Sequence, residues 1–141
     1  MIRALTALSL FALIGCTSAA ERPQRPATSG VVEAIALVKA DKIDVNLDKW
    51  NEPACIATEA ELKKLIPDEA TQKRLMKEVD FKTHVLLVFS WEGSGADKFG
   101  YVILESFPEQ VNFSLKSGVQ LDHQSHLKLF AVKKECTWSA K

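Results

Sequence analysis

HVLLVFSW, residues 84–91, is the stretch that decides the fold. Its β-branched, aromatic and apolar residues form a run shorter than an ordinary helix, which is typical of a buried β-strand. The residues that follow keep a strand-like pattern to the end of the chain. Further strands are predicted at Tyr101–Glu105, Val111–Leu115, Leu127–Lys133 and Glu135–Trp138.

Short connections separate these strands, at Gly93–Asp97, Pro108–Glu109 and Ser117–Gly118. Strands that follow one another through short turns favour antiparallel pairing, because a parallel pair needs a longer crossover. Two earlier segments favour strands as well. They are Val31–Val38, whose alanines also suit a helix, and Ile43–Leu47, in which apolar and polar residues alternate.

Two short helices are predicted upstream of these strands. The first begins at Thr58, because Thr58 and Glu61 have the spacing of a capping box, in which each side chain accepts from a backbone N–H of the other. Pro67 ends that helix, and the second carries Leu75 and Met76 on its apolar face. The expected fold class is therefore α+β, an antiparallel sheet or partial barrel with two short helices packed on one side.

The N-terminal segment has the pattern of a targeting signal. A positive charge at Arg3 precedes an apolar core at residues 4–14, which has the length of a signal peptide and is too short to span a bilayer. The core ends in Leu13-Ile14-Gly15-Cys16, which resembles a bacterial lipobox. The resemblance implies that residues 1–15 are a lipoprotein signal peptide and that Cys16 receives a diacylglycerol. The alternative is secretory cleavage after Ala20, which leaves a soluble periplasmic or secreted protein.

This signal divides the chain into three expected segments. Behind the signal peptide, residues 16–30 are expected to be a lipidated cysteine and a flexible tether, because prolines and small residues offer little to a core. Residues 31–141 are expected to form a single globular domain. Two or three acyl chains hold a protein firmly on a membrane. Thr17 follows the lipid cysteine, and by resemblance to Gram-negative lipoproteins this favours the outer membrane.

The charge balance excludes a general attraction to nucleic acid. The chain has 18 basic and 18 acidic side chains, and removal of residues 1–15 takes away one Arg and leaves a net charge of −1. A near-neutral domain has no broad electrostatic preference for nucleic acid or for anionic lipid. The expected partners are therefore the membrane, through the lipid, and a protein of the envelope.

Cysteine usage fits an exported protein. With Cys16 lipidated, Cys55 and Cys136 remain, and in an oxidising compartment we predict a disulfide between them. The alternative is two buried or reactive thiols, of which Cys55 becomes a nucleophile only if a histidine lies beside it.

The connection from Trp91 to Lys98 is the most unusual local feature, because two glycines spaced by Ser94 lie among charged and aromatic residues. It lacks the spacing of a P-loop and of a nucleophile elbow. One reading is an ordinary hairpin whose glycines adopt positive φ. The other is a contact loop, in which we predict Trp91, Ser94 and Asp97 as partner contacts, with Trp91 exposed.

The segment Asp122–His126 brings two imidazoles and a carboxylate close together in the sequence. A weak zinc or copper site competes here with ordinary solvated side chains. In a strand, however, His123 and His126 point to opposite faces. A triad of Ser94 with a His and an Asp can be written down, but geometry is its test. We predict no metal site, no cofactor and no catalytic residue.

Residues 79–103 resemble the C-terminal β domain of a family of bacterial protease-complex subunits. The shared pattern is Val79-Asp80-Phe81, an apolar strand at Val85–Phe89, a glycine-containing turn, and Gly100-Tyr101-Val102-Ile103. Phe99 stands where the family has a second glycine. The resemblance implies protein binding, and the chain as a whole resembles small lipoproteins of bacterial envelopes.

The expected function is a lipid-anchored, non-enzymatic binding or accessory module of the cell envelope. One alternative is a periplasmic protease inhibitor or accessory subunit of a protease complex, which would use the same loop. The other is a hydrolase whose site the sequence does not reveal. A binding module predicts an exposed apolar patch near the loop, whereas an enzyme predicts a deep pocket with converging titratable groups.

Overall fold

The computed structural model describes residues 30–38, 41, 43, 45 and 49–141. The lipobox, Cys16 and the tether up to residue 29 lie outside these residues, as does most of the strand expected at Ile43–Leu47, so those predictions remain predictions. Among the described residues, no helix is long and apolar enough to cross a membrane.

Seven strands and two helices follow one another along the described part of the chain. They are β1 (Val32–Ile35), β2 (Ala54–Ile56), α1 (Glu59–Leu65), α2 (Glu69–Glu78), β3 (His84–Gly93), β4 (Lys98–Leu104), β5 (Gln110–Lys116), β6 (Gln124–Lys133) and β7 (Thr137–Ala140). The predicted α+β class is confirmed, and neither sheet closes into a barrel. β2 was not predicted, because it has only three residues and follows directly on Pro53.

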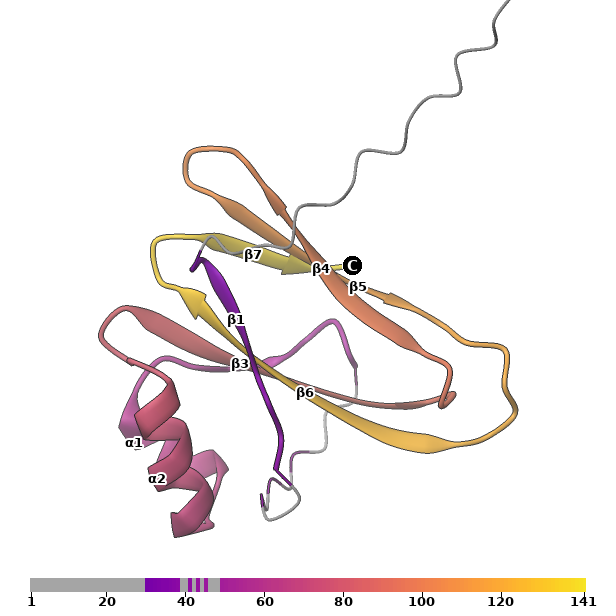
Figure 1. Ribbon diagram of the computed structural model, residues 1–141, viewed down its shortest axis with the longest axis horizontal. Helices are drawn as coiled ribbons and strands as arrows, with labels where there is room; N and C mark the ends of the chain where they lie inside the picture. Colours follow the sequence, from indigo (N-terminus) through magenta and orange to yellow (C-terminus); the bar gives the residue numbers. More distant parts are fainter. Residues whose placement is uncertain (1–29, 39–40, 42, 44, 46–48) are drawn as a thin grey trace, which may run out of the picture.

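The strands form two sheets that lie one above the other (Figure 1). A four-stranded antiparallel sheet has the order β1-β6-β3-β2, and a three-stranded sheet has the order β4-β5-β7. The prediction of antiparallel neighbours is correct for β4 and β5. It is wrong for β3 and β4, for β5 and β6, and for β6 and β7, because the members of each pair belong to different sheets. Both edges of β3 are occupied, by β2 and β6, so the chain crosses to the second sheet instead of making a hairpin. β7 pairs parallel to β5.

β3 is buried on both faces, which explains why its sequence is apolar without alternation. Leu86 and Val88 face one core cluster, which includes residues of both helices. Leu87 and Phe89 face the other, which fills the space between the two sheets. The molecule therefore has three layers, with the helices against one face of the four-stranded sheet and the three-stranded sheet against the other.

Aromatic rings dominate the layer between the sheets. The ring of Phe89 lies 4.8 Å from those of Phe99 and Phe113, and 5.9 Å from that of Phe130, measured between centroids. Such tilted and edge-on pairs add about 0.5–1.5 kcal/mol each beyond the area they bury. Phe99 and Phe113 come from the three-stranded sheet, so these contacts join the two sheets.

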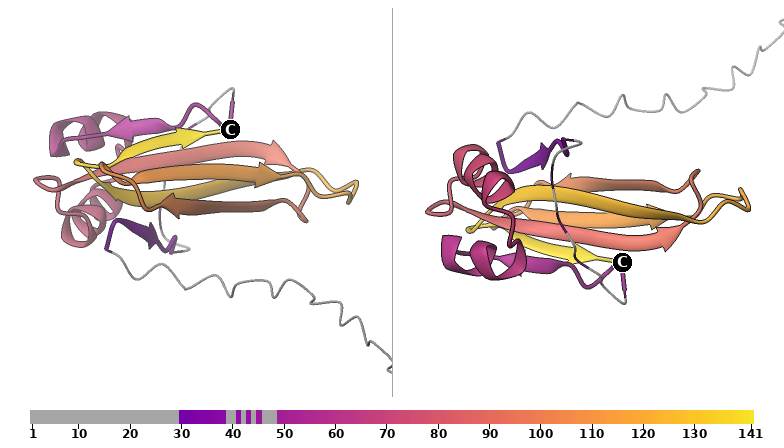
Figure 2. Two further views of the ribbon diagram at one scale, coloured as in Figure 1. Left: turned by 90° about the horizontal axis from the view of Figure 1, so that it is seen from above. Right: turned by 90° about the horizontal axis from the view of Figure 1, so that it is seen from below.

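The first helix begins as predicted. Thr58 caps α1: the amide of Glu61 donates to Thr58 Oγ1 at 3.2 Å, and the amide of Thr58 donates to Glu61 Oε2 at 3.2 Å. Asp68 caps α2 by accepting from the amide and the hydroxyl of Thr71, at 2.9 and 2.8 Å. Both helices lie at one end of the sandwich (Figure 2).

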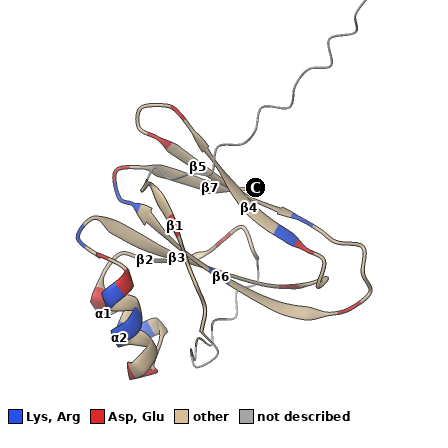
Figure 3. Cartoon of the chain, viewed as in Figure 1, with Lys and Arg blue, Asp and Glu red and all other residues tan. Residues whose placement is uncertain are grey.

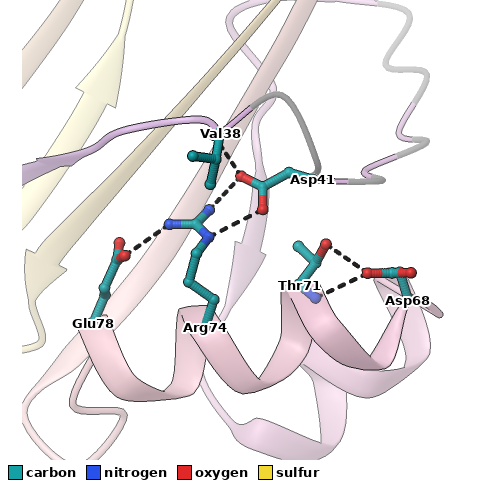
Figure 4. A network of polar contacts seen from close by, with 6 residues as sticks. All are labelled: Val38, Asp41, Asp68, Thr71, Arg74 and Glu78. Atoms are coloured by element: carbon teal, nitrogen blue, oxygen red, sulfur yellow. Dashed lines mark hydrogen bonds and ion pairs between the residues drawn. The ribbon is translucent and has the colours of Figure 1, made fainter.

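An ion pair joins α2 to the segment that follows β1 (Figure 4). Both Arg74 Nε and Nη2 donate to the carboxylate of Asp41, and Arg74 Nη1 donates to Glu78 Oε1 at 2.8 Å. The amide of Val38 also donates to Asp41, at 2.9 Å. The Asp41 side chain is only 6% exposed, so the fork-like guanidinium is what compensates its buried charge.

Candidate functional site

The end of the sandwich away from the helices is formed by two connections (Figure 2). One joins β3 to β4 and contains Ser94–Asp97, and the other joins β5 to β6 and contains Ser117–His123. Polar contacts between them hold this loop end together, and two aspartates, one from each connection, make most of those contacts.

Asp97 reaches from the first connection to the second. Its Oδ1 accepts from the amide of Gly118 at 2.7 Å, and its Oδ2 accepts from the indole N–H of Trp91 at 3.1 Å. The Gly118 amide, foremost, and the Trp91 indole hold the pKa of Asp97 below its ordinary value, because both donors stabilise the charged carboxylate.

Asp122 reaches in the opposite direction. Its Oδ1 accepts from the amide of Gly95 at 3.0 Å and from the Ser94 hydroxyl at 3.4 Å. Its Oδ2 accepts from the side-chain amide of Gln124 at 2.8 Å. The two connections are therefore tied by reciprocal contacts, each supplying a carboxylate to backbone N–H groups of the other.

Trp91 lies inside this arrangement. Its ring stacks against Phe99 on one side, at 5.1 Å between centroids, and against His126, at 4.7 Å and an interplanar angle of 15°. Only 7% of Trp91 is exposed, so the prediction of an exposed Trp91 is wrong. The reason is its position in β3, where it shares the inward face with Leu87 and Phe89 and gives its N–H to Asp97.

The glycines of the loop end serve close approach rather than positive φ. Among the described residues only Gly30 has positive φ, so the hairpin interpretation is wrong on this point. A Cβ on Gly118 would lie 2.6 Å from the backbone carbon of Ala96, and one on Gly95 would lie 2.3 Å from Asp122 Oδ2. The glycines let the two connections touch.

A groove of about 950 Å³ runs along the loop end. It is lined by both connections and by the turn that precedes β2. Its lining includes Lys49, Trp50, Glu92, Asp97, Leu115, Leu121, Asp122 and His123. The groove is bordered by polar groups, and His123 Nε2 lies 4.0 Å from Glu92 Oε2, with both side chains largely exposed.

Two apolar side chains project beside this groove. Val119 is 95% exposed and Leu121 is 104% exposed, so neither makes a significant contact within the described domain. Sequence analysis did not single them out. The signal that could have found them is an apolar pair placed between the turn residues Ser117-Gly118 and the polar pair Asp122-His123.

The chemistry of an activated serine is not present here. His126 Nε2 lies 3.0 Å from the backbone oxygen of Ser94, not from its hydroxyl. The Ser94 hydroxyl accepts from the amide of Ala96 at 3.1 Å and donates to Asp122. Ser94, His126 and Asp122 therefore lie close together, but the histidine does not contact the serine hydroxyl as it would in a catalytic triad. Among the described residues, no group of three His, Cys, Asp or Glu side chains could hold a metal ion.

The two cysteines are free thiols in the structure. Cys55 lies on β2 and is exposed, and Cys136 lies in the turn between β6 and β7 and is buried. The disulfide between them therefore remains a prediction.

Neither thiol has the surroundings of a nucleophile. Desolvation raises the pKa of the Cys55 thiol, and the negative charge of Glu61 raises it further. Desolvation and the charges of Glu109 and Glu135 likewise raise the pKa of Cys136. A thiol with a raised pKa stays protonated at neutral pH and reacts slowly.

Comparison of the chain with protein-family models, with curated proteins and with solved structures finds no match.

Proposed function

We propose that this chain is a lipid-anchored protein of the bacterial envelope, and that its domain binds another protein through the loop end. The lipobox at Leu13–Cys16 supports the anchor. The loop end supports the binding role, since it combines an exposed apolar pair and a groove with two connections that are hydrogen-bonded to each other. This proposal assigns no catalysis to the domain.

The exposed pair Val119 and Leu121 is the observation that carries the binding proposal. Burying an apolar side chain against a partner stabilises a complex by about 1.5–3 kcal/mol for a side chain of this kind. The pair is flanked by Gly118 and Asp122, each of which is hydrogen-bonded to the other connection. A loop held at both flanks loses little conformational entropy on binding, which favours affinity.

The residues predicted as contacts acquire a different role in this proposal. Trp91 and Asp97 support the β5–β6 connection, because the Trp91 indole donates to Asp97 and the other oxygen of Asp97 accepts from the Gly118 amide. Ser94 connects to Asp122 in the same way. In this proposal the exposed pair Val119 and Leu121, beside these residues, makes the contact with the partner.

Site-specific photo-crosslinking tests the binding role. A photoreactive amino acid replaces Leu121 in one full-length chain and Phe107 in another, expressed in their native envelope. Phe107 is the matched control, because it is 105% exposed and follows β4 at the opposite end of β5. We expect a discrete crosslinked protein from position 121 only. No product from position 121, or the same products from both positions, would show that the loop end is not a contact surface.

The intact mass of the protein from its own membranes tests the anchor. We expect a chain that begins at Cys16 and carries the mass of a diacylglycerol and further acyl groups. A chain beginning at Glu21 without lipid would contradict the anchor and leave the binding role standing. The same spectrum, taken with and without reductant, reports the Cys55–Cys136 bond, since reduction adds two hydrogen atoms.

A further inference from the structure

The described chain starts at the same end of the sandwich as the β4–β5 hairpin, which is the end opposite the loop end (Figure 1). The amide of Lys133, the last residue of β6, donates to the backbone oxygen of Val31 at 3.0 Å. The turn after β6 leads to Thr137, whose amide donates to the backbone oxygen of Glu109 at 3.0 Å. These two hydrogen bonds hold the start of the described chain and the base of the hairpin against the same short turn.

An apolar side chain projects from the tip of this hairpin, residues 105–109. Phe107 is 105% exposed, so it makes no significant contact within the described domain. On the strand that leads to the tip, Val102 and Leu104 are 49% and 44% exposed. The Ser106 hydroxyl donates to the backbone oxygen of Pro108 at 2.7 Å, which braces the tip around the aromatic side chain. An exposed ring on a braced turn is suited to insertion into an apolar phase.

The charges around the tip favour a zwitterionic surface over an anionic one. Glu105 and Glu109 stand on either side of the aromatic side chain, and residues 104–110 contain no Lys or Arg, as Figure 3 shows. Behind the hairpin, Lys133 pairs with Glu135, at 3.7 Å between Nζ and Oε1. The hairpin therefore lacks the basic residues by which juxtamembrane segments attract anionic lipid. Insertion of an apolar ring needs no such attraction.

We propose that Phe107 is a second membrane contact, which inserts into the zwitterionic bilayer that holds the lipid on Cys16. The inference rests on the lipid anchor of the proposed function. Gly30, the first residue of the described chain, lies fourteen positions after Cys16, and fourteen residues span at most about 50 Å. The anchor thus holds the domain by the end that carries Phe107, and the tip meets the bilayer without the chain running back along the domain.

The anchor makes a small apolar contact sufficient. A side chain on a tethered domain meets the bilayer at a high effective concentration, so one ring that could not hold a free protein on a membrane can orient an anchored one. The ten residues of β3 span about 33 Å. With Phe107 in the bilayer, the loop end lies about that far from it. Val119 and Leu121 are then presented to a protein outside the bilayer and not to lipid.

Quenching by brominated lipid tests which end touches the bilayer. Phe107→Trp and Leu121→Trp are made separately in the full chain, and each lipidated protein is reconstituted into phosphatidylcholine vesicles with and without bromine on the acyl chains. Bromine quenches an indole in the hydrocarbon region, and the parent chain gives the contribution of Trp50, Trp91 and Trp138. We expect loss of most of the emission added at position 107 and no loss at position 121. Both positions are fully exposed, so neither substitution should disturb the fold.

Two further measurements define the contact. Val102→Trp lies on β4, five positions before Phe107, so its added emission should be quenched less than that of Phe107→Trp. Addition of phosphatidylglycerol should not increase the quenching at position 107, because Glu105 and Glu109 flank the ring. An increase would mean that charge governs the contact, and equal quenching at positions 102 and 107 would mean that the sheet lies flat on the membrane. Either result overturns the proposal.

The intact mass of each reconstituted protein separates failure of this contact from failure of the anchor. Absence of quenching at position 107 in a chain that carries lipid on Cys16 overturns the membrane contact and leaves the anchor standing. Equal quenching at positions 107 and 121 in such a chain does the same, because the domain then has no preferred orientation. A chain without lipid contradicts the anchor, and the membrane contact falls with it.

Discussion

The two ends of the sandwich are each held by an aspartate, but the donors differ. At the helix end, Asp41 is nearly buried and accepts from the charged guanidinium of Arg74. At the loop end, Asp97 accepts from the uncharged N–H groups of Trp91 and Gly118. A buried carboxylate needs a cation, since leaving water is costly for an unpaired charge. A carboxylate at the rim keeps solvent on its remaining lone pairs and needs only neutral donors.

The two ends of the sandwich also differ in what they contribute to the protein. At the helix end, the ion pair fastens a segment of the chain onto α2, and the apolar side chains beside it, Leu37 and Val38, are 41% and 51% exposed. At the loop end, the hydrogen bonds hold a connection in place while Val119 and Leu121 stay exposed. The first arrangement stabilises the fold, and the second presents a surface.

Removal of the cation at the helix end should have the largest effect on stability. Arg74→Ala leaves Asp41 buried without a charged partner, so we expect a loss of about 3 kcal/mol in the free energy of unfolding. Denaturant unfolding followed by tryptophan fluorescence measures it. Glu78→Ala removes only the exposed partner of Arg74 and should cost less than about 1 kcal/mol. Equal losses in the two variants would mean that Asp41 is not effectively buried.

Gly118→Ala should have the next largest effect, and it acts at the loop end. The added Cβ would meet backbone of Ala96, which cannot move as a flexible side chain does, so we expect a loss of about 1–3 kcal/mol. Gly100→Ala is the matched control, because nothing lies within 4 Å of a Cβ there. If both variants unfold at the same denaturant concentration, the two connections are not in contact.

Asp97→Asn should have a smaller effect that depends on pH. The pKa of Asp97 is lowered in the folded protein, so its contribution is complete above the ordinary carboxyl pKa of about 3.9 and disappears as the pH falls through the lowered value. The parent chain should therefore lose stability over this acid range, and the variant should lose less of it. Thermal unfolding between neutral and acid pH measures the difference. Glu92→Gln, at an exposed carboxylate, should keep the acid dependence of the parent.

The double variant Val119→Ser, Leu121→Ser should have the smallest effect on stability, within about 0.5 kcal/mol, because neither side chain is buried. It should nevertheless abolish binding at the loop end. Crosslinking from position 123, introduced on both backgrounds, measures this, with circular dichroism as the check on folding. A strongly destabilised double variant would mean that these side chains support the fold instead.

Much of the fold could be predicted from local sequence. The strand at residues 84–91, the capping box at Thr58 and the break at Pro67 depend on neighbours in the chain, and each appears in the structure. The pairing of β5 with β7 could not be predicted, because it joins segments separated by a whole strand. β2 was missed because three residues carry too little periodicity to be recognised.

The candidate site could likewise be predicted only in part from the sequence. The position of the glycine-rich loop could be located from composition, but the burial of Trp91 depends on which face of β3 meets the second sheet. Asp122 and Gly118 acquire their roles only when the β5–β6 connection folds over the β3–β4 connection.

The sequence by itself therefore determined the strands, the caps and the candidate export signal, since these follow from residue type and from contacts within a few positions. Only the tertiary structure decided which loops meet, which glycines must lack a side chain, and which apolar residues stay exposed. These properties depend on contacts between residues more than twenty positions apart, such as Asp97 with Gly118, and no local pattern encodes them.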